Sequence, residues 1–85
     1  MSGMYDLLVD LLVNRFEVDR NDVRPEVTFD ELEMDSLFLV ELLLVLQSEL
    51  GERGALISED VASPSDTIAD AARLIEDQIA AGATS

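Results

Sequence analysis

The residues of this chain best suited to chemistry are Asp35-Ser36-Leu37, which stand at the start of a strongly apolar helical pattern. A helix N-terminus carries unpaired N–H groups and a partial positive charge, which would stabilise a phosphate on Ser36 by about 0.3–1 kcal/mol. The simpler interpretation is that Ser36 or Asp35 only caps the helix, since such residues are common at helix starts. The two interpretations are compatible, because a capping position also exposes the hydroxyl.

Other reactive groups are missing. The chain has no cysteine and no histidine, which excludes disulfides, thiolate zinc sites, cysteine nucleophiles and a Ser-His-Asp triad. The acidic run from Asp30 to Asp35 does not fit a calcium-binding EF-hand, because Asp35 would occupy the position that requires glycine. We therefore predict no metal site, and we expect a protein that is not an enzyme.

The composition predicts one small helical domain. Of the 85 residues, 48% are hydrophobic but only 5% are aromatic, so the expected core consists of Leu, Val, Ile and Ala. The formal net charge of −14 argues against nucleic acid and anionic membranes, and it favours docking onto basic patches of partner proteins. No signal peptide or membrane-spanning run is visible, so we expect a soluble, cytoplasmic monomer.

Apolar spacing predicts three long helices. The first runs from about Met4 to Phe16, with Ser2 as a candidate cap. The second runs from Ser36 to Leu50 and stops at Gly51, a residue suited to a helix C-terminus. The last is predicted from Asp66, as its N-cap, to about Ala81.

The connection Glu17–Glu33 is long and contains Pro25, which cannot lie inside a helix. We expect it to pack onto the core, because so long an irregular segment is unusual in a small domain. Four apolar residues are its predicted anchors: Val23, Val27, Phe29 and Leu32. Short helical turns are predicted at Asp30–Leu32 and Ser58–Val61. The chain is thus expected to form a single all-α domain over residues 1–85, with an ordered core of about residues 4–81.

The second helix has two apolar faces. Five leucines gather on one side as an ordinary core face: Leu39, Leu42, Leu43, Leu46 and Leu50. A second stripe, interleaved with Glu41, falls on a different side and contains Leu37, Val40 and Leu44. The pattern alone leaves open whether this stripe is further core or a docking surface for another protein.

These residues resemble a known family. Leu32-Glu33-Met34-Asp35-Ser36-Leu37, followed by Val40-Glu41-Leu42, is similar to the attachment motif of acyl carrier proteins, and the resemblance covers nearly the whole chain. It implies a four-helix bundle in which a phosphopantetheinyl transferase moves 4′-phosphopantetheine from coenzyme A onto Ser36. The thiol of that arm would carry acyl groups as thioesters, with acyltransferases and ketosynthase-type enzymes as further partners.

The resemblance also implies roles for neighbouring residues. Asp35 would help to position the serine for the transferase. Partner enzymes would read a surface made of Leu37, Val40, Glu41 and Leu44, which favours the docking interpretation of the second stripe. Three leucines are implied candidates to line an acyl cavity, in which each buried methylene contributes about 0.8 kcal/mol: Leu39, Leu43 and Leu46.

Two departures from the family pattern bear on function. Glu33 stands where the family usually has glycine, so we expect a differently shaped loop before the helix. Phe38, Gln47 and Ser48 make the second helix less acidic than in primary fatty-acid carriers, which favours a stand-alone carrier of a polyketide or related specialised pathway, such as antibiotic biosynthesis. The alternatives are a primary fatty-acid carrier and an unmodified acidic adaptor that docks through the second helix.

Overall fold

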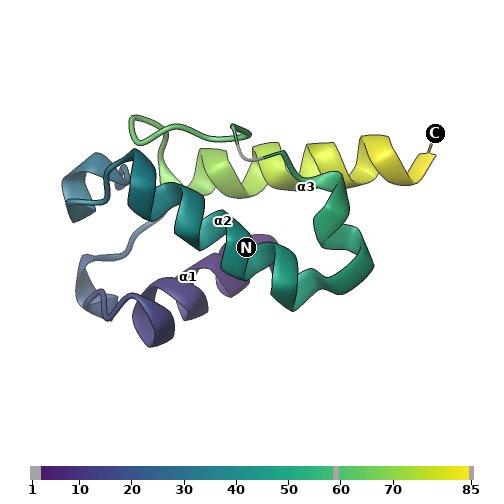
Figure 1. Cartoon of the computed structure of the whole chain (residues 1–85). Coiled ribbons are helices and arrows are strands. Elements are labelled where there is room, and N and C mark those ends of the chain that lie inside the picture. The colour runs from purple at the N-terminus through teal and green to yellow at the C-terminus, as the bar shows by residue number, and fades with distance from the viewer. Residues whose placement is uncertain (1–2, 59, 85) are drawn as a thin grey trace.

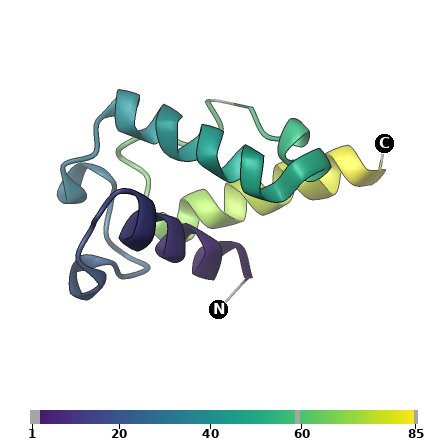
Figure 2. The ribbon, with the colours of Figure 1, turned by 60° about the horizontal axis from the view of Figure 1, so that its bottom comes forward.

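The computed structural model describes residues 3–58 and 60–84, which fold into three α-helices and three short 3₁₀ helices. In chain order they are α1 (Gly3–Arg15), η1 (Arg20–Asp22), η2 (Asp30–Leu32), α2 (Ser36–Leu50), η3 (Gly51–Leu56) and α3 (Ile68–Thr84). Helix α1 contacts both other α-helices and runs opposite to them, as Figures 1 and 2 show. The predicted all-α fold is confirmed.

The core forms where the apolar faces of the three α-helices meet the connection between α1 and α2. Its fully buried large side chains are Leu8, Leu12, Phe29, Leu42, Leu43, Leu46, Ile68 and Ile75. Each such side chain contributes about 1.5–3 kcal/mol through removal from water. Burial also raises the pKa of the Tyr5 hydroxyl on α1, and the carboxylates of Glu26 and Asp6 raise it further.

The long connection packs onto the helices as predicted. Val23, Val27 and Phe29 are buried, and Leu32 is half-buried. Two backbone hydrogen bonds tie this connection to the segment around the start of α3: the Asp30 N–H donates to the Pro64 carbonyl (2.9 Å), and the Ile68 N–H donates to the Val27 carbonyl (2.9 Å). These bonds place the loop before α2 against the loop before α3, so both helices start at the same end of the molecule (Figure 1).

Helix α2 has the predicted bounds. It ends at Gly51, whose φ of +62° lies in the region that glycine adopts without strain. The chain then winds tightly as η3. Gly54 permits this close return, because a Cβ there would collide with the Gln47 carbonyl.

The predicted N-cap of the last helix is wrong. Helix α3 begins at Ile68, and Thr67 caps it, because Thr67 Oγ1 accepts the Asp70 N–H at 3.0 Å. Asp66 has a different structural part: its Oδ2 accepts the Ser63 N–H at 2.8 Å and closes the turn that precedes the helix. Both residue types can serve as caps, so the sequence did not distinguish them.

Other boundaries differ from the predicted ones by a few residues. Helix α1 ends at Arg15, and α3 extends to Thr84. The short turn predicted at Ser58–Val61 is not helical where the structure describes it: the Val61 N–H donates to the Ser58 carbonyl (3.2 Å) in a turn, and Glu59 lies outside the described residues. The candidate cap Ser2 also lies outside them. None of the helices over residues 3–58 and 60–84 has the length and apolar character needed to cross a bilayer.

Candidate functional site

Ser36 is the first residue of α2, and it is exposed. The N-cap is Asp35, whose Oδ1 accepts the Phe38 N–H at 3.1 Å. The capping role, which the sequence left open between the two residues, therefore belongs to Asp35. No described residue forms a hydrogen bond with the Ser36 hydroxyl. The positive end of the helix beside it favours a phosphate ester at this oxygen.

The turn that leads into α2 contains a strained residue. Glu33 has φ 62° and ψ 29°, and its N–H donates to the Asp30 carbonyl at 3.0 Å. Met34 follows as a buried anchor, with its N–H on the Phe29 carbonyl at 3.0 Å. A non-glycine residue in this left-handed region pays about 1–2 kcal/mol that glycine does not. Glu33 thus adopts the backbone conformation for which the glycine of the family pattern is suited.

The second apolar stripe of α2 lies on the surface. Leu37 is 66% exposed, Leu44 is 48% exposed and Phe38 is 46% exposed. Glu41 is also exposed, and Val40 is half-buried. The described residues leave Leu37 and Leu44 exposed and cover Val40 in part, so the stripe is a partly open surface and not further core. The opposite face is buried as predicted at Leu39, Leu42, Leu43 and Leu46, while Leu50 is half-buried.

A cavity of about 290 Å³ opens beside Ser36, between α2 and the segment that leads to α3. Its lining consists of Ser36, Leu39, Val40, Asp60, Ala62, Ser63 and Pro64. Of the three leucines predicted to line an acyl cavity, only Leu39 contributes to this one, because Leu43 and Leu46 are fully buried in the core. Helical periodicity carried no signal for Ala62 and Pro64, since they reach the site from a loop far away in the sequence.

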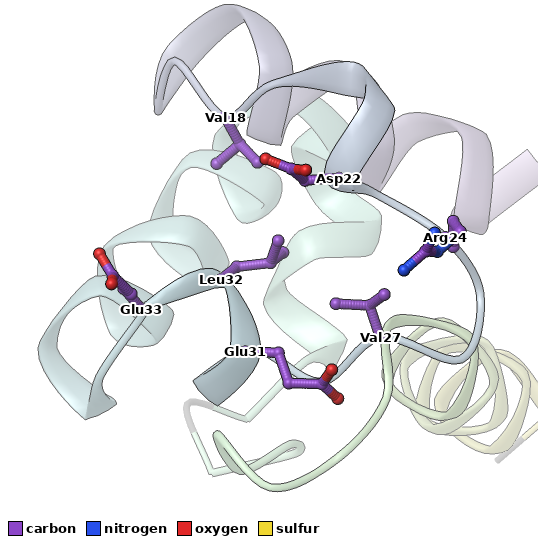
Figure 3. A pocket seen from close by; sticks show the side chains of 7 residues that line it. All are labelled: Val18, Asp22, Arg24, Val27, Glu31, Leu32 and Glu33. Atoms are coloured by element: carbon purple, nitrogen blue, oxygen red, sulfur yellow. The ribbon is translucent and has the colours of Figure 1, made fainter.

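Two further cavities adjoin the turn before α2. One, of about 290 Å³, is lined by five apolar residues and one carboxylate: Phe16, Val18, Leu32, Glu33, Met34 and Phe38. The other, of about 440 Å³, is lined by Val18, Asp22, Arg24, Val27, Glu31, Leu32 and Glu33. In Figure 3, Leu32 and Val27 point toward each other across the second cavity, with the carboxylates of Glu31 and Asp22 at its edges. The two cavities share Val18, Leu32 and Glu33 and are therefore neighbours.

The acidic side chains around these cavities do not form a metal centre. Across residues 3–58 and 60–84, no three acidic side chains are grouped so that they could hold an ion.

Comparison with known proteins agrees with this geometry. The sequence model of a family described as "Phosphopantetheine attachment site" matches residues 6–75, a range that includes Ser36. The chain is also similar to an acyl carrier protein of Lactobacillus acidophilus, with 34% identity over 74 residues, covering 86% of this chain and 89% of that protein. No solved structure matches the chain. The chain belongs to the acyl carrier protein family, whose members are carriers rather than catalysts, hold a covalent 4′-phosphopantetheine group and interact with biosynthetic enzymes.

Proposed function

We propose that this protein tethers acyl or polyketide intermediates on a 4′-phosphopantetheine arm at Ser36 and presents them to biosynthetic enzymes. The observation that carries this proposal is the exposed Ser36 hydroxyl on the first turn of α2, which is free because Asp35 is the cap. The bound arm supplies a terminal thiol, which this cysteine-free chain lacks, and holds acyl groups as thioesters. The protein acts as a cytoplasmic monomer.

Attachment needs little from the carrier itself beyond an accessible, well-placed hydroxyl. Ser36 Oγ forms a bond to the pantetheine-bearing phosphorus of coenzyme A, the bond from that phosphorus to the adenosine bisphosphate breaks, and the hydroxyl proton passes to a base of the transferase. Asp35 positions the serine by fixing the first turn of α2 through its bond to the Phe38 N–H. The remaining N–H groups of that turn favour the negative charge of the new phosphodiester by about 0.3–1 kcal/mol.

Partner enzymes dock on the second stripe of α2, at Leu37, Val40, Glu41 and Leu44. Support comes from the exposure of Leu37 and Leu44 together with the Glu41 carboxylate between them on the same stripe. Apolar contacts of this kind supply affinity once a partner covers them, whereas the net charge of −14 speeds the encounter with basic enzyme surfaces. The transferase, acyltransferases and ketosynthase-type enzymes are the proposed users of this surface.

We also propose a place for the acyl chain next to Ser36. We assign it to the 290 Å³ cavity in which Leu39 forms part of the apolar wall. Leu43 and Leu46 would contact a chain only if the cavity deepened into the core, because both are fully buried. Each methylene taken up there would contribute about 0.8 kcal/mol.

Among pathways, we favour a polyketide or related specialised route over primary fatty-acid synthesis. Support comes from Phe38, an exposed aromatic residue two positions after Ser36. Gln47 gives less support, because its Nε2 donates to the Ile57 carbonyl at 2.9 Å and so has a structural use. The intact mass of the protein from its native host identifies the cargo: a chain that keeps several unreduced keto groups supports this route, and a plain saturated chain assigns the protein to fatty-acid synthesis.

Modification of Ser36 is tested directly by incubating the protein with coenzyme A, Mg²⁺ and a broad-specificity phosphopantetheinyl transferase. We expect the intact mass to increase by one phosphopantetheine, and Ser36→Ala to abolish the increase without loss of helical circular dichroism. Ser65→Ala, which alters an exposed serine in the loop before α3, is the matched control. An unmodified wild-type chain, or a Ser36→Ala variant that keeps full activity in cells, would instead favour the unmodified adaptor.

A further inference from the structure

We propose that Gln47 and Gln78 are positioning residues that limit the length of the acyl chain this protein can shelter. Their side chains tie α2 and α3 to the same short stretch of backbone, Ile57–Ser58, and so hold together the region into which the cavity beside Ser36 would have to deepen. This inference rests on the proposed carrier function and on the cavity assigned there to the acyl chain. It adds the residues that set how far the chain can enter.

The two glutamines reach Ile57–Ser58 from different helices. From α2, Gln47 Nε2 donates to the Ile57 carbonyl at 2.9 Å. From α3, Gln78 Oε1 accepts the Ser58 N–H at 2.9 Å, and Gln78 Nε2 donates to Ser58 Oγ at 3.1 Å. Both glutamines are half-buried, where water competes less for such bonds. Two successive residues of the loop therefore bridge α2 and α3.

The bridge lies further along α2 than the cavity. Leu39 forms part of the cavity wall, and Leu43 and Gln47 follow it at intervals of four residues, so the three lie on one side of the helix. Gln47 follows Leu39 by eight residues, which is about 12 Å of helix. An acyl chain that enters beside Leu39 and continues along α2 therefore meets the bond between Gln47 and Ile57.

The loop that walls the cavity is held at both of its ends. The glutamines hold Ile57–Ser58 at one end, and the Asp30 N–H holds the Pro64 carbonyl at the other (2.9 Å). Helix η3, which precedes this loop, contacts both α2 and α3. A chain that goes deeper must separate the loop from these helices and break the glutamine bonds before it can contact Leu43 and Leu46.

The two glutamines use opposite hydrogen-bonding groups. Gln47 donates to a carbonyl, and a carboxylate cannot replace it because a carboxylate is only an acceptor. Gln78 accepts a backbone N–H, and a carboxylate oxygen can still do so. The same substitution, glutamine to glutamate, is therefore expected to break the bridge at Gln47 and to keep it at Gln78.

The test measures how well the protein shelters acyl chains of increasing length. A phosphopantetheinyl transferase loads the chain from a series of saturated acyl-coenzyme A thioesters, from butanoyl to dodecanoyl. Cleavage by hydroxylamine is then followed by intact mass. Each further methylene that the cavity shelters should slow cleavage about fourfold, the fold-change that corresponds to about 0.8 kcal/mol. In the wild type we expect this slowing to level off within the series.

Variants of the two glutamines are expected to extend the sheltered length. Cleavage of Gln47→Ala and Gln78→Ala should keep slowing for chains at which the wild type has levelled off. Gln47→Glu should behave like Gln47→Ala, and Gln78→Glu like the wild type. Ser48→Ala and Asp77→Ala alter the exposed neighbours of the two glutamines and are the matched controls, for which no change is expected.

The outcomes separate this inference from the proposed function. A wild-type chain that never receives the arm refutes the carrier function itself. A loaded wild type whose cleavage does not depend on chain length leaves the carrier function in place and refutes both the sheltering cavity and the limit set by the glutamines. Glutamine variants that level off where the wild type does, or that expose chains of every length to faster cleavage, show that the glutamines only stabilise the fold and overturn the proposal.

Discussion

The two faces of α2 are built from the same residue type but have different surroundings. Leu42 and Leu46 lie in the core formed with α1 and the other elements, whereas Leu37 and Leu44 face solvent on the same helix. A buried leucine stabilises the fold of the chain by itself. An exposed leucine contributes binding free energy only when another protein covers it. Apolar residues of one helix can therefore serve either stability or recognition. Whether a given leucine serves one or the other depends on which residues pack against it.

The largest expected difference between the two faces is in stability, and truncating one leucine on each face measures it. We expect Leu46→Ala to lower the free energy of unfolding by about 2–5 kcal/mol, because it leaves a cavity in the core. Leu44→Ala should change stability by no more than about 0.5 kcal/mol, since its side chain is half exposed. Urea unfolding followed by circular dichroism measures both values. Equal losses for the two variants would contradict the assignment of the faces.

Both faces belong to a helix whose first turn is capped by Asp35. Asp35→Ala should cost about 1 kcal/mol of unfolding free energy, because the Phe38 N–H loses its partner. Asp35→Asn is the control: its side-chain oxygen still accepts this hydrogen bond, so stability should be nearly retained. Thermal unfolding of the three proteins decides the point, and an Asp35→Asn variant as unstable as Asp35→Ala would show that the carboxylate charge, not the cap, matters.

The smallest expected effect concerns the turn that leads into α2. Glu33→Gly should stabilise the protein by up to about 1 kcal/mol, because glycine relieves the left-handed strain but loses more backbone entropy on folding. Glu33→Ala keeps the Cβ and the strain, so no such gain is expected from it. Denaturant midpoints compare the variants. A destabilised Glu33→Gly protein would mean that contacts of the Glu33 side chain outweigh the strain of its backbone.

Much of the fold was predictable because helical periodicity is a local signal. The bounds of α2, its core face and the anchoring of the connection by Phe29 were predicted from apolar spacing and are confirmed. The cap of α3 was assigned to Asp66 instead of Thr67, because neighbouring polar residues compete for that position and only the backbone path selects one of them. The turn at Ser58–Val61 was predicted as helical, but its described residues form a non-helical turn.

The candidate site, like the fold, was predictable from the sequence only in part. The motif around Ser36 and the existence of a second apolar stripe were open to sequence reasoning, since both depend on residues close together in the chain. The pattern left the exposure of that stripe open. The cavities were not, because their walls combine segments such as Phe16, Leu32 and Pro64 that are far apart along the chain. These walls form through packing between distant segments, and helical periodicity contains no information about such packing.

The sequence by itself determined the all-α class, the acidic surface, the absence of any thiol or imidazole and the serine at the head of an apolar helix. Each of these follows from residue chemistry or from a repeat of a few residues. The tertiary structure decided that Leu37 and Leu44 of the second stripe stay exposed, that Asp35 caps the helix and leaves Ser36 free, and that residue 33 is left-handed. Burial and backbone conformation at those positions depend on neighbours brought together by folding, and no local pattern contains them.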